Sequence, residues 1–298
     1  MNKIQTSKKI NSAESRFGFL LLLPGLAVFC FIILYPFVNS IRMSFTDQTI
    51  FSPKVNFIWF DNFIRIFSDP NFPNVIKNTL IFVVFGASLP FVIGFIWALV
   101  LNQKFRGSEL MRGVTLVCWI IPSTSIGFLW MWIFHGHYGV LNAVLTSLGI
   151  IENNITWLGQ ISTAMPVVII AKTWQSLPWF MSFLLAGLQS IPHETIESSR
   201  IDGAGNLRVF WHIVLPEMKY IITLVLTLSV IGSLQHFDLL WVMTQGGPAR
   251  ATTTLSVEVY SKAFMSFKLG LAASVGTIWV VLLAVIGFIY LRRVKDEI

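Results

Sequence analysis

The chain has 298 residues, of which 55% are hydrophobic and 14% aromatic, while only 12% are Asp, Glu, Lys or Arg. So few charged groups cannot cover a water-soluble protein of this size, and the mean hydropathy of +0.72 excludes an ordinary cytosolic enzyme and a disordered chain. In a lipid-embedded protein, the formal charge of +7 indicates basic residues kept on the cytoplasmic side, and it does not predict nucleic-acid binding. The two cysteines, Cys30 and Cys118, lie in apolar runs and are interpreted as small buried residues without a disulfide.

Six apolar stretches are long enough to cross a bilayer, because about 20 helical residues span its hydrocarbon core. They are expected at residues 17–38, 78–101, 113–134, 161–188, 220–244 and 269–291. Only the fourth and fifth contain a charged residue, Lys172 and Asp238 respectively. The sequence therefore predicts an all-α membrane protein with six transmembrane helices. Its membrane domain is expected over residues 17–291, between terminal segments at 1–16 and 292–298.

The distribution of basic residues predicts the orientation of these spans. With the N-terminus in the cytoplasm, 13 Lys and Arg residues lie inside, beginning with Lys3, Lys8 and Lys9, and 7 lie outside. Because cytoplasmic segments retain positive charge, we expect both termini to be cytoplasmic. The first span is expected to remain as an anchor, since its apolar core is long for a cleavable signal and no A-x-A site follows. The external stretch 41–77, rich in aromatic residues, is expected along the outer interface.

The internal connection 189–219 has features that a simple turn does not require. Pro192 suits the first turn of a short helix, and the residues at 203–205, Gly-Ala-Gly, are expected to end it. A second short helix is expected over 207–215, with the next span starting at Pro216. The connection could be an interfacial helix under the lipid headgroups or a docking surface for a protein. Its acidic groups favour a protein partner, because an anionic leaflet would repel them: Glu194, Glu197, Asp202 and Glu217.

Three motifs carry a resemblance to a known family. The first runs from Glu197 through Ser198, Ser199, Asp202, Gly203 and Ala204 to Ile213, Leu215 and Pro216. It resembles the E-A-A-x-x-D-G-A…I-x-L-P loop of ABC importer permeases, with two serines in place of the alanines. The block Gly246-Gly247-Pro248 is similar to the G-G-P segment of carbohydrate-uptake permeases of the maltose and glycerol-3-phosphate type, and residues 270–274, Gly-Leu-Ala-Ala-Ser, resemble the start of their last span.

The resemblance implies a translocation subunit in a bacterial inner membrane, with no enzymatic activity of its own. The implied partners are a second, homologous permease subunit, two copies of a cytoplasmic ATPase and an extracytoplasmic solute-binding protein. The first motif would form the coupling helix that docks on the ATPase. ATP and Mg would bind the ATPase, and this chain would hold no cofactor or metal. No G-x-x-x-x-G-K-[ST] run occurs in the sequence, which agrees with that division of labour.

Polar residues within the fourth and fifth spans are the candidates for contact with a solute, because polar groups in lipid are costly and usually face a cavity or a partner. They are Lys172, Trp174, Gln175 and Ser176 in the fourth span, and Ser233, Gln235, His236 and Asp238 in the fifth. By resemblance, the second group stands where maltose-type permeases carry polar sugar contacts. Lys172 could instead pair with Asp238 or extend towards an interface. If it faces the pore, its positive charge favours an acidic sugar or polyol.

Other functions remain open at this point. An ion-coupled secondary carrier would need more ionisable groups inside its spans than occur here. A membrane anchor or sensor would leave the polar residues of the fourth and fifth spans unexplained. An ABC permease for amino acids or peptides is disfavoured by the G-G-P block. Trp119, Trp130 and Trp132 are interpreted as lipid-facing or packing residues.

Overall fold

A computed structural model describes residues 12–52, 54–103 and 105–295 of the chain. Within these ranges the fold is helical, and its one β-type contact is an isolated bridge between Thr46 and Phe57. The expectations for residues 1–11, 53, 104 and 296–298 lie outside the described residues. These residues include the basic residues Lys3, Lys8 and Lys9 and parts of the expected terminal segments 1–16 and 292–298.

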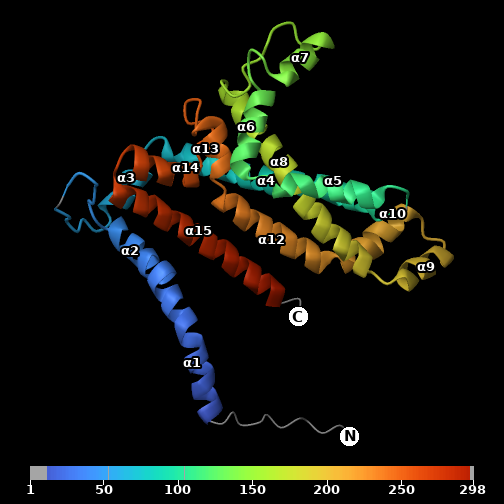
Figure 1. The fold of residues 1–298 in the computed structure, drawn as a ribbon, viewed down its shortest axis with the longest axis horizontal. Coiled ribbons are helices and arrows are strands. Elements are labelled where there is room, and N and C mark those ends of the chain that lie inside the picture. Colours follow the sequence, from blue (N-terminus) through green and yellow to red (C-terminus); the bar gives the residue numbers. More distant parts are fainter. Residues whose placement is uncertain (1–11, 53, 104, 296–298) are drawn as a thin grey trace.

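The first span stands apart from the other helices. It comprises α1 (Ser12–Phe29), a π-helical turn at Cys30–Leu34 and α2 (Tyr35–Ser44), and it projects from the rest of the molecule (Figure 1). Its C-terminal end docks on α15 (Leu269–Lys295), where the Ser274 hydroxyl donates to the carbonyl oxygen of Ser44 at 2.8 Å. Cys30 is exposed on this helix and Cys118 is half-buried, so the interpretation of both as buried residues is wrong.

Three long helices form the centre of the fold. They are α4 (Phe72–Leu101), α8 (Ile161–Ser190) and α12 (Lys219–Gln235). The helices α4 and α8 approach closely at Gly94, where a Cβ would lie 2.7 Å from the Cβ of Phe180. A side chain at position 94 would therefore separate the two backbones. The largest buried cluster, which includes Phe95, Leu184 and Met218, fills the contacts among these three helices.

The third expected span is not one helix. It consists of α5 (Ser108–Ile120) and α6 (Ser123–Ile133), which meet at an angle of 99°. Ile121 is extended and precedes Pro122, a residue that cannot donate a backbone hydrogen bond and disfavours a helical conformation before it. The prediction of a continuous span over 113–134 is therefore wrong.

The fifth expected span is also divided. After α12 ends at Gln235, His236 is extended, and a new helix, α13 (Asp238–Thr244), begins. The carbonyl oxygen of His236 accepts a hydrogen bond of 2.9 Å from the Ser256 hydroxyl, which satisfies a backbone group that the helix no longer uses. The prediction of a continuous span over 220–244 is wrong.

Among the described residues, three helices are long and apolar enough to cross a membrane, judged by length and composition alone: Phe19–Ser44, Phe72–Leu101 and Leu269–Phe288. The pair α5 and α6, and the pair formed by Asn206–Glu217 with α12, each add one if a bent pair counts as a span. The helix α8 is as long as α4, with 30 residues, but it contains more polar residues than α4 and is not among these candidates. The six-span count therefore stays a prediction. The remaining short helices are α3 (Asp61–Phe67), α7 (Val140–Ser147), α9 (His193–Ile201), α10 (Asn206–Val209), a π-helical turn at Phe210–Val214, α11 (Leu215–Glu217), α14 (Leu255–Tyr260) and a π-helical turn at Ser261–Met265.

Candidate functional site

A cavity of about 360 Å³ lies between α5, α8 and α12, and we call it the central cavity. The helix α8 contributes residues 172, 175, 176 and 179, whose spacing places them on one helical face. The helix α12 and the break after it supply the opposite wall. The lining residues are Trp119, Lys172, Gln175, Ser176, Trp179, Phe180, Leu228, Ser229, Gly232 and His236.

Several polar atoms around the central cavity have no partner within the described part of the chain. Gln175 donates from Nε2 to the Ser123 hydroxyl at 2.7 Å, while its Oε1 is buried and unpaired. The Nε2 of His236 is also buried and unpaired, and the imidazole stacks on Phe82 with ring centroids 6.0 Å apart. Because unpaired buried polar atoms are costly, these two atoms need a partner such as an ordered water.

The structure brings together four of the eight predicted solute-contact residues. Lys172, Gln175, Ser176 and His236 line the central cavity. Gln235 is exposed at the end of α12, and Asp238 is exposed in the first turn of α13. The ion pairs found among the described residues do not include one between Lys172 and Asp238.

The other two predicted residues lie beside the cavity. Trp174 packs into a buried cluster, with its ring 6.0 Å from that of Trp130. Ser233 is buried, and its hydroxyl faces Gly86 of α4, where a Cβ would lie 3.7 Å from Ser233 Oγ and 3.6 Å from Lys172 Cγ. Both distances correspond to ordinary van der Waals contact, so Lys172 and Ser233 pack against α4 at this position.

Sequence reasoning missed the aromatic lining of this cavity. Trp119 was interpreted as a lipid-facing or packing residue, yet it lines the cavity with Trp179 and Phe180. The spacing of Trp179, seven residues after Lys172, was the available signal, since positions i and i+7 share a helical face. For Trp119 no local signal exists, because it is the one residue of α5 in the described lining and no spacing within α5 marks it.

The internal connection forms a short helical hairpin, which we call the coupling segment (residues 193–217). It lies at one end of α8 and α12, at the opposite end from α3 and α14 (Figure 1). As predicted, the first helix follows Pro192 and ends before Gly203, which has a positive φ of 82°. The second helical piece runs through Pro216 to Glu217, so the expected boundary at Pro216 is wrong; α12 begins at Lys219 after a bend of 67°.

The motif residues of the coupling segment lie on this hairpin. The hydroxyls of Ser198 and Ser199 donate to the carbonyl oxygens of Thr195 and Ile196, so the hydrogen-bond donor of each serine has its acceptor within α9. Contacts of Ile196 and other apolar residues with the main buried cluster fix the hairpin to the bundle. The remaining motif residues follow along the same hairpin: Glu197, Asp202, Gly203, Ala204, Ile213, Leu215 and Pro216.

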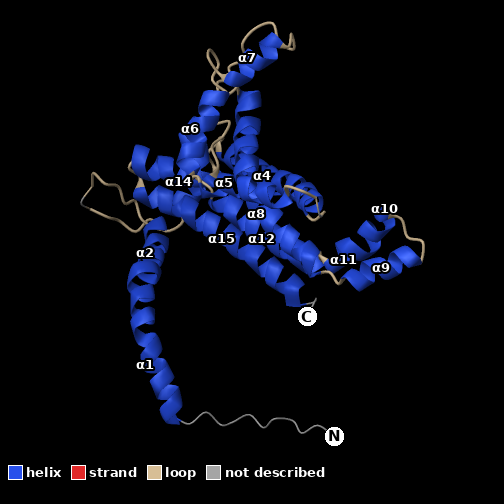
Figure 2. Ribbon diagram, turned by 45° about the vertical axis from the view of Figure 1, so that its right-hand side comes forward, coloured by secondary structure: helices blue, strands red, loops and turns tan. Residues whose placement is uncertain are grey.

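Large apolar side chains are exposed at the tip of the coupling segment. Ile201 is 87% exposed, and Leu207 and Trp211 are exposed as well. The turned view in Figure 2 shows α9 and α10 extending beyond the long helices. Exposed apolar residues next to acidic ones, on a hairpin that packs against the main buried cluster, are typical of a protein-docking surface.

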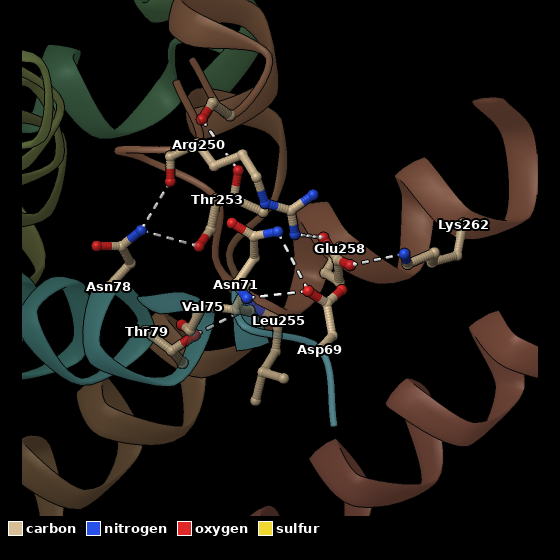
Figure 3. Close-up of polar contacts among 11 residues, drawn as sticks. Asp69, Asn71, Val75, Asn78, Thr79, Arg250, Thr253, Leu255, Glu258 and Lys262 are labelled. Carbon is tan, nitrogen blue, oxygen red and sulfur yellow. Dashed lines mark hydrogen bonds and ion pairs between the residues drawn. The ribbon is translucent and has the colours of Figure 1, made fainter. Parts of the chain in front are cut away.

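The G-G-P block lies in the connection between α13 and α14. Thr252 and Thr253 donate through their hydroxyls to the carbonyl oxygens of Gly247 and Gly246, at 2.8 and 3.0 Å. From α4, Asn78 donates to the carbonyl oxygens of Arg250 and Thr253 (Figure 3). These hydrogen bonds attach the connection to the N-terminal half of α4.

A buried carboxylate stabilises the same connection. Glu258 of α14 pairs with Arg250 at 2.5 Å and with Lys262 at 3.4 Å (Figure 3). Nearby, the backbone N–H of Asn71 donates to Asp69 and holds the pKa of that carboxyl below its usual value, and the attraction of Lys262 and Arg250 adds to this effect. This end of the fold therefore has a fixed arrangement of charges.

The helical bundle, the coupling segment and the G-G-P connection together define a membrane transport subunit. Residues 91–296 match the family model described as binding-protein-dependent transport system inner membrane component. The chain belongs to this family.

Relatives match over almost the whole chain. The trehalose/maltose transport system permease protein MalF of Thermococcus litoralis is 30% identical, over 98% of each chain. The sulfoquinovosyl glycerol transport system permease protein SmoG of Agrobacterium fabrum is 32% identical, over 93% of this chain and 90% of its own. A chain of a bacterial ABC transporter for the acidic polysaccharide alginate has the same fold, with a TM-score of 0.80 at 20% identity, covering 94% of this chain and 96% of its own.

Proposed function

We propose that this chain is the permease subunit of an ATP-driven importer that moves a sugar, oligosaccharide or polyol into the cytoplasm. The observation that carries the proposal is the central cavity, where indole rings lie beside hydrogen-bonding groups. Carbohydrates present apolar C–H faces together with hydroxyl groups, and such a lining suits both. Two relatives with carbohydrate cargo, matched over nearly their whole length, support the same conclusion.

The coupling segment is the site at which an ATPase drives the transport cycle. Its exposed apolar tip, with Ile201 and Leu207, offers a docking surface, and its attachment to the main buried cluster would transmit a movement to α8 and α12. Two copies of a cytoplasmic ATPase hydrolyse ATP with Mg, one on this chain and one on a second, homologous permease subunit. The chain itself is not an enzyme and binds no cofactor or metal.

The proposed orientation rests on the distribution of charges and on the proposed docking role of the coupling segment. Both termini and the coupling segment face the cytoplasm of a bacterial cell, and the G-G-P connection faces outwards, where an extracytoplasmic solute-binding protein delivers the solute. The excess of basic residues on the proposed inner side supports this arrangement. The apolar first span, with Phe31 exposed, contacts lipid and the second permease.

A pair of glycine variants tests the coupling role. Gly203 in the coupling segment and Gly149 after α7 both have positive φ and open space where a Cβ would lie. Gly203→Asp and Gly149→Asp therefore carry a similar backbone cost. In the reconstituted complex, we expect Gly203→Asp to uncouple ATP hydrolysis from sugar uptake, while Gly149→Asp keeps them coupled. Normal coupling in Gly203→Asp, or an equal loss in both variants, would contradict the proposal.

A further inference from the structure

Lys172 places a positive charge in the middle of the bundle. It is the twelfth residue of α8, so the nearer end of the helix lies about 16 Å away along its axis, beyond the reach of a lysine side chain. The side chain therefore cannot extend to an interface, and it lines the central cavity instead.

No described carboxylate compensates this charge. The helices α4, α8 and α12 contain no acidic residue, and Glu109 in the first turn of α5 lies ten residues, or about 15 Å, before the cavity residue Trp119. Asp238 is exposed beyond the helix break and forms no ion pair with Lys172. The other titratable side chain in the lining is His236, which is a base as well.

An ammonium group within a membrane domain is costly unless an anion or water accompanies it. An open cavity supplies water, but closure around a solute removes much of it. A solute that carries its own negative charge would then provide the counter-ion. The polar side chains of the lining, Gln175 and Ser176 among them, would meet its hydroxyls, and the rings of Trp119 and Trp179 would meet its apolar face.

We infer that the transported carbohydrate is anionic, with a carboxylate, sulfonate or phosphate group that pairs with Lys172 in the central cavity. This inference rests on the proposed function of the chain as a carbohydrate permease. It adds the charge of the solute and the residue that recognises it. A charge-assisted hydrogen bond of this kind corresponds to a preference of about 10- to 100-fold over a neutral sugar.

The test compares four probes in proteoliposomes that contain the complete transporter with its binding protein. The probes are a glucosyl disaccharide and its carboxylated, sulfonated and phosphorylated derivatives. The variants are Lys172→Gln, Lys172→Arg and, as a control for loss of an external charge, Lys54→Gln. The binding protein is the same in every experiment. The ratio of variant to wild-type uptake for each probe therefore cancels the selectivity of the binding protein. Basal ATP hydrolysis per assembled complex verifies folding.

We expect the wild type to take up at least one anionic derivative faster than the parent disaccharide. Lys172→Gln should lower that uptake about 10- to 100-fold and change uptake of the parent less than twofold. Lys172→Arg should recover most of the preference, and Lys54→Gln should match the wild type. Parent uptake as fast as that of every derivative, or an unchanged preference in Lys172→Gln, would overturn the inference alone. Absence of ATP-dependent uptake for all four probes would overturn the proposed function with it.

Discussion

Replacement of Glu258 by glutamine should destabilise the membrane domain more than the loss of an ion pair usually does. Glu258 is buried, and its two carboxylate oxygens face Arg250 and Lys262. Glutamine keeps the size of the side chain, but it removes the negative charge and directs an N–H donor at one of the two cations. Both cations then lie beside a neutral group at the end of the fold that contains the G-G-P connection.

The expected magnitude follows from the exposure of the partners. Removing one member of a buried ion pair costs about 3–5 kcal/mol, because the remaining charge is left uncompensated. The side chains of Arg250 and Lys262 are 38% and 22% exposed, so water recovers part of this loss. We therefore expect Glu258→Gln to lower the free energy of unfolding by about 3 kcal/mol.

An exposed ion pair in the same chain provides the control. Arg65 and Asp61 lie 2.6 Å apart, but their side chains are 65% and 44% exposed. Loss of such a pair costs about 0.2–1 kcal/mol. Denaturant unfolding in one detergent, followed by tryptophan fluorescence, would compare Glu258→Gln with Asp61→Asn. Equal losses of stability in the two variants would refute the reasoning, because burial would then have no effect on the energy of the pair.

Two further predictions concern packing and a hydrogen-bonded loop. Gly94→Ala should lower the free energy of unfolding by about 1–3 kcal/mol in the same assay, because the new Cβ meets Phe180 at 2.7 Å. Gly276→Ala is the control and should not destabilise the protein, because there is open space where its Cβ would lie. Equal stability of the two variants would contradict this reasoning. Asn142 is buried and forms hydrogen bonds with Gly136, Ile155 and Trp157. Asn142→Ala should therefore loosen this loop and accelerate chymotrypsin cleavage after Tyr138. Asn154→Ala, which loses one exposed hydrogen bond, should be cut at the wild-type rate.

Local sequence signals were sufficient for the first helix of the coupling segment. Pro192 precedes the first residue of α9 and favours the start of a helix, and Gly203 follows its end because glycine adopts a positive φ readily. Neither effect depends on distant parts of the chain. The long apolar helices also follow from composition, since a run such as α4 has no charge over residues 78–101. These are the features that depend on a few neighbouring residues.

The breaks in the helices could not be predicted in the same way. Pro122 ends α5, yet Pro90 and Pro178 lie inside α4 and α8, so a proline alone does not decide between a bend and a continuous helix. At His236 there is neither proline nor glycine, and the freed carbonyl is satisfied by Ser256, 20 positions away. Tertiary contacts determine where the helices break, and they also determine which residues face the central cavity.

The docking role of the coupling segment can be tested most directly by site-specific crosslinking. A photoreactive phenylalanine analogue would replace Ile201 at its tip or, as control, Ile120 at the end of α5, two positions of similar exposure at 87% and 79%. Irradiation of the assembled transporter in membranes, followed by mass spectrometry, would identify what each position touches. We predict that position 201 crosslinks to the ATPase subunit and position 120 does not. Crosslinks from position 201 to phospholipid, with none to a nucleotide-hydrolysing protein, would contradict the docking role.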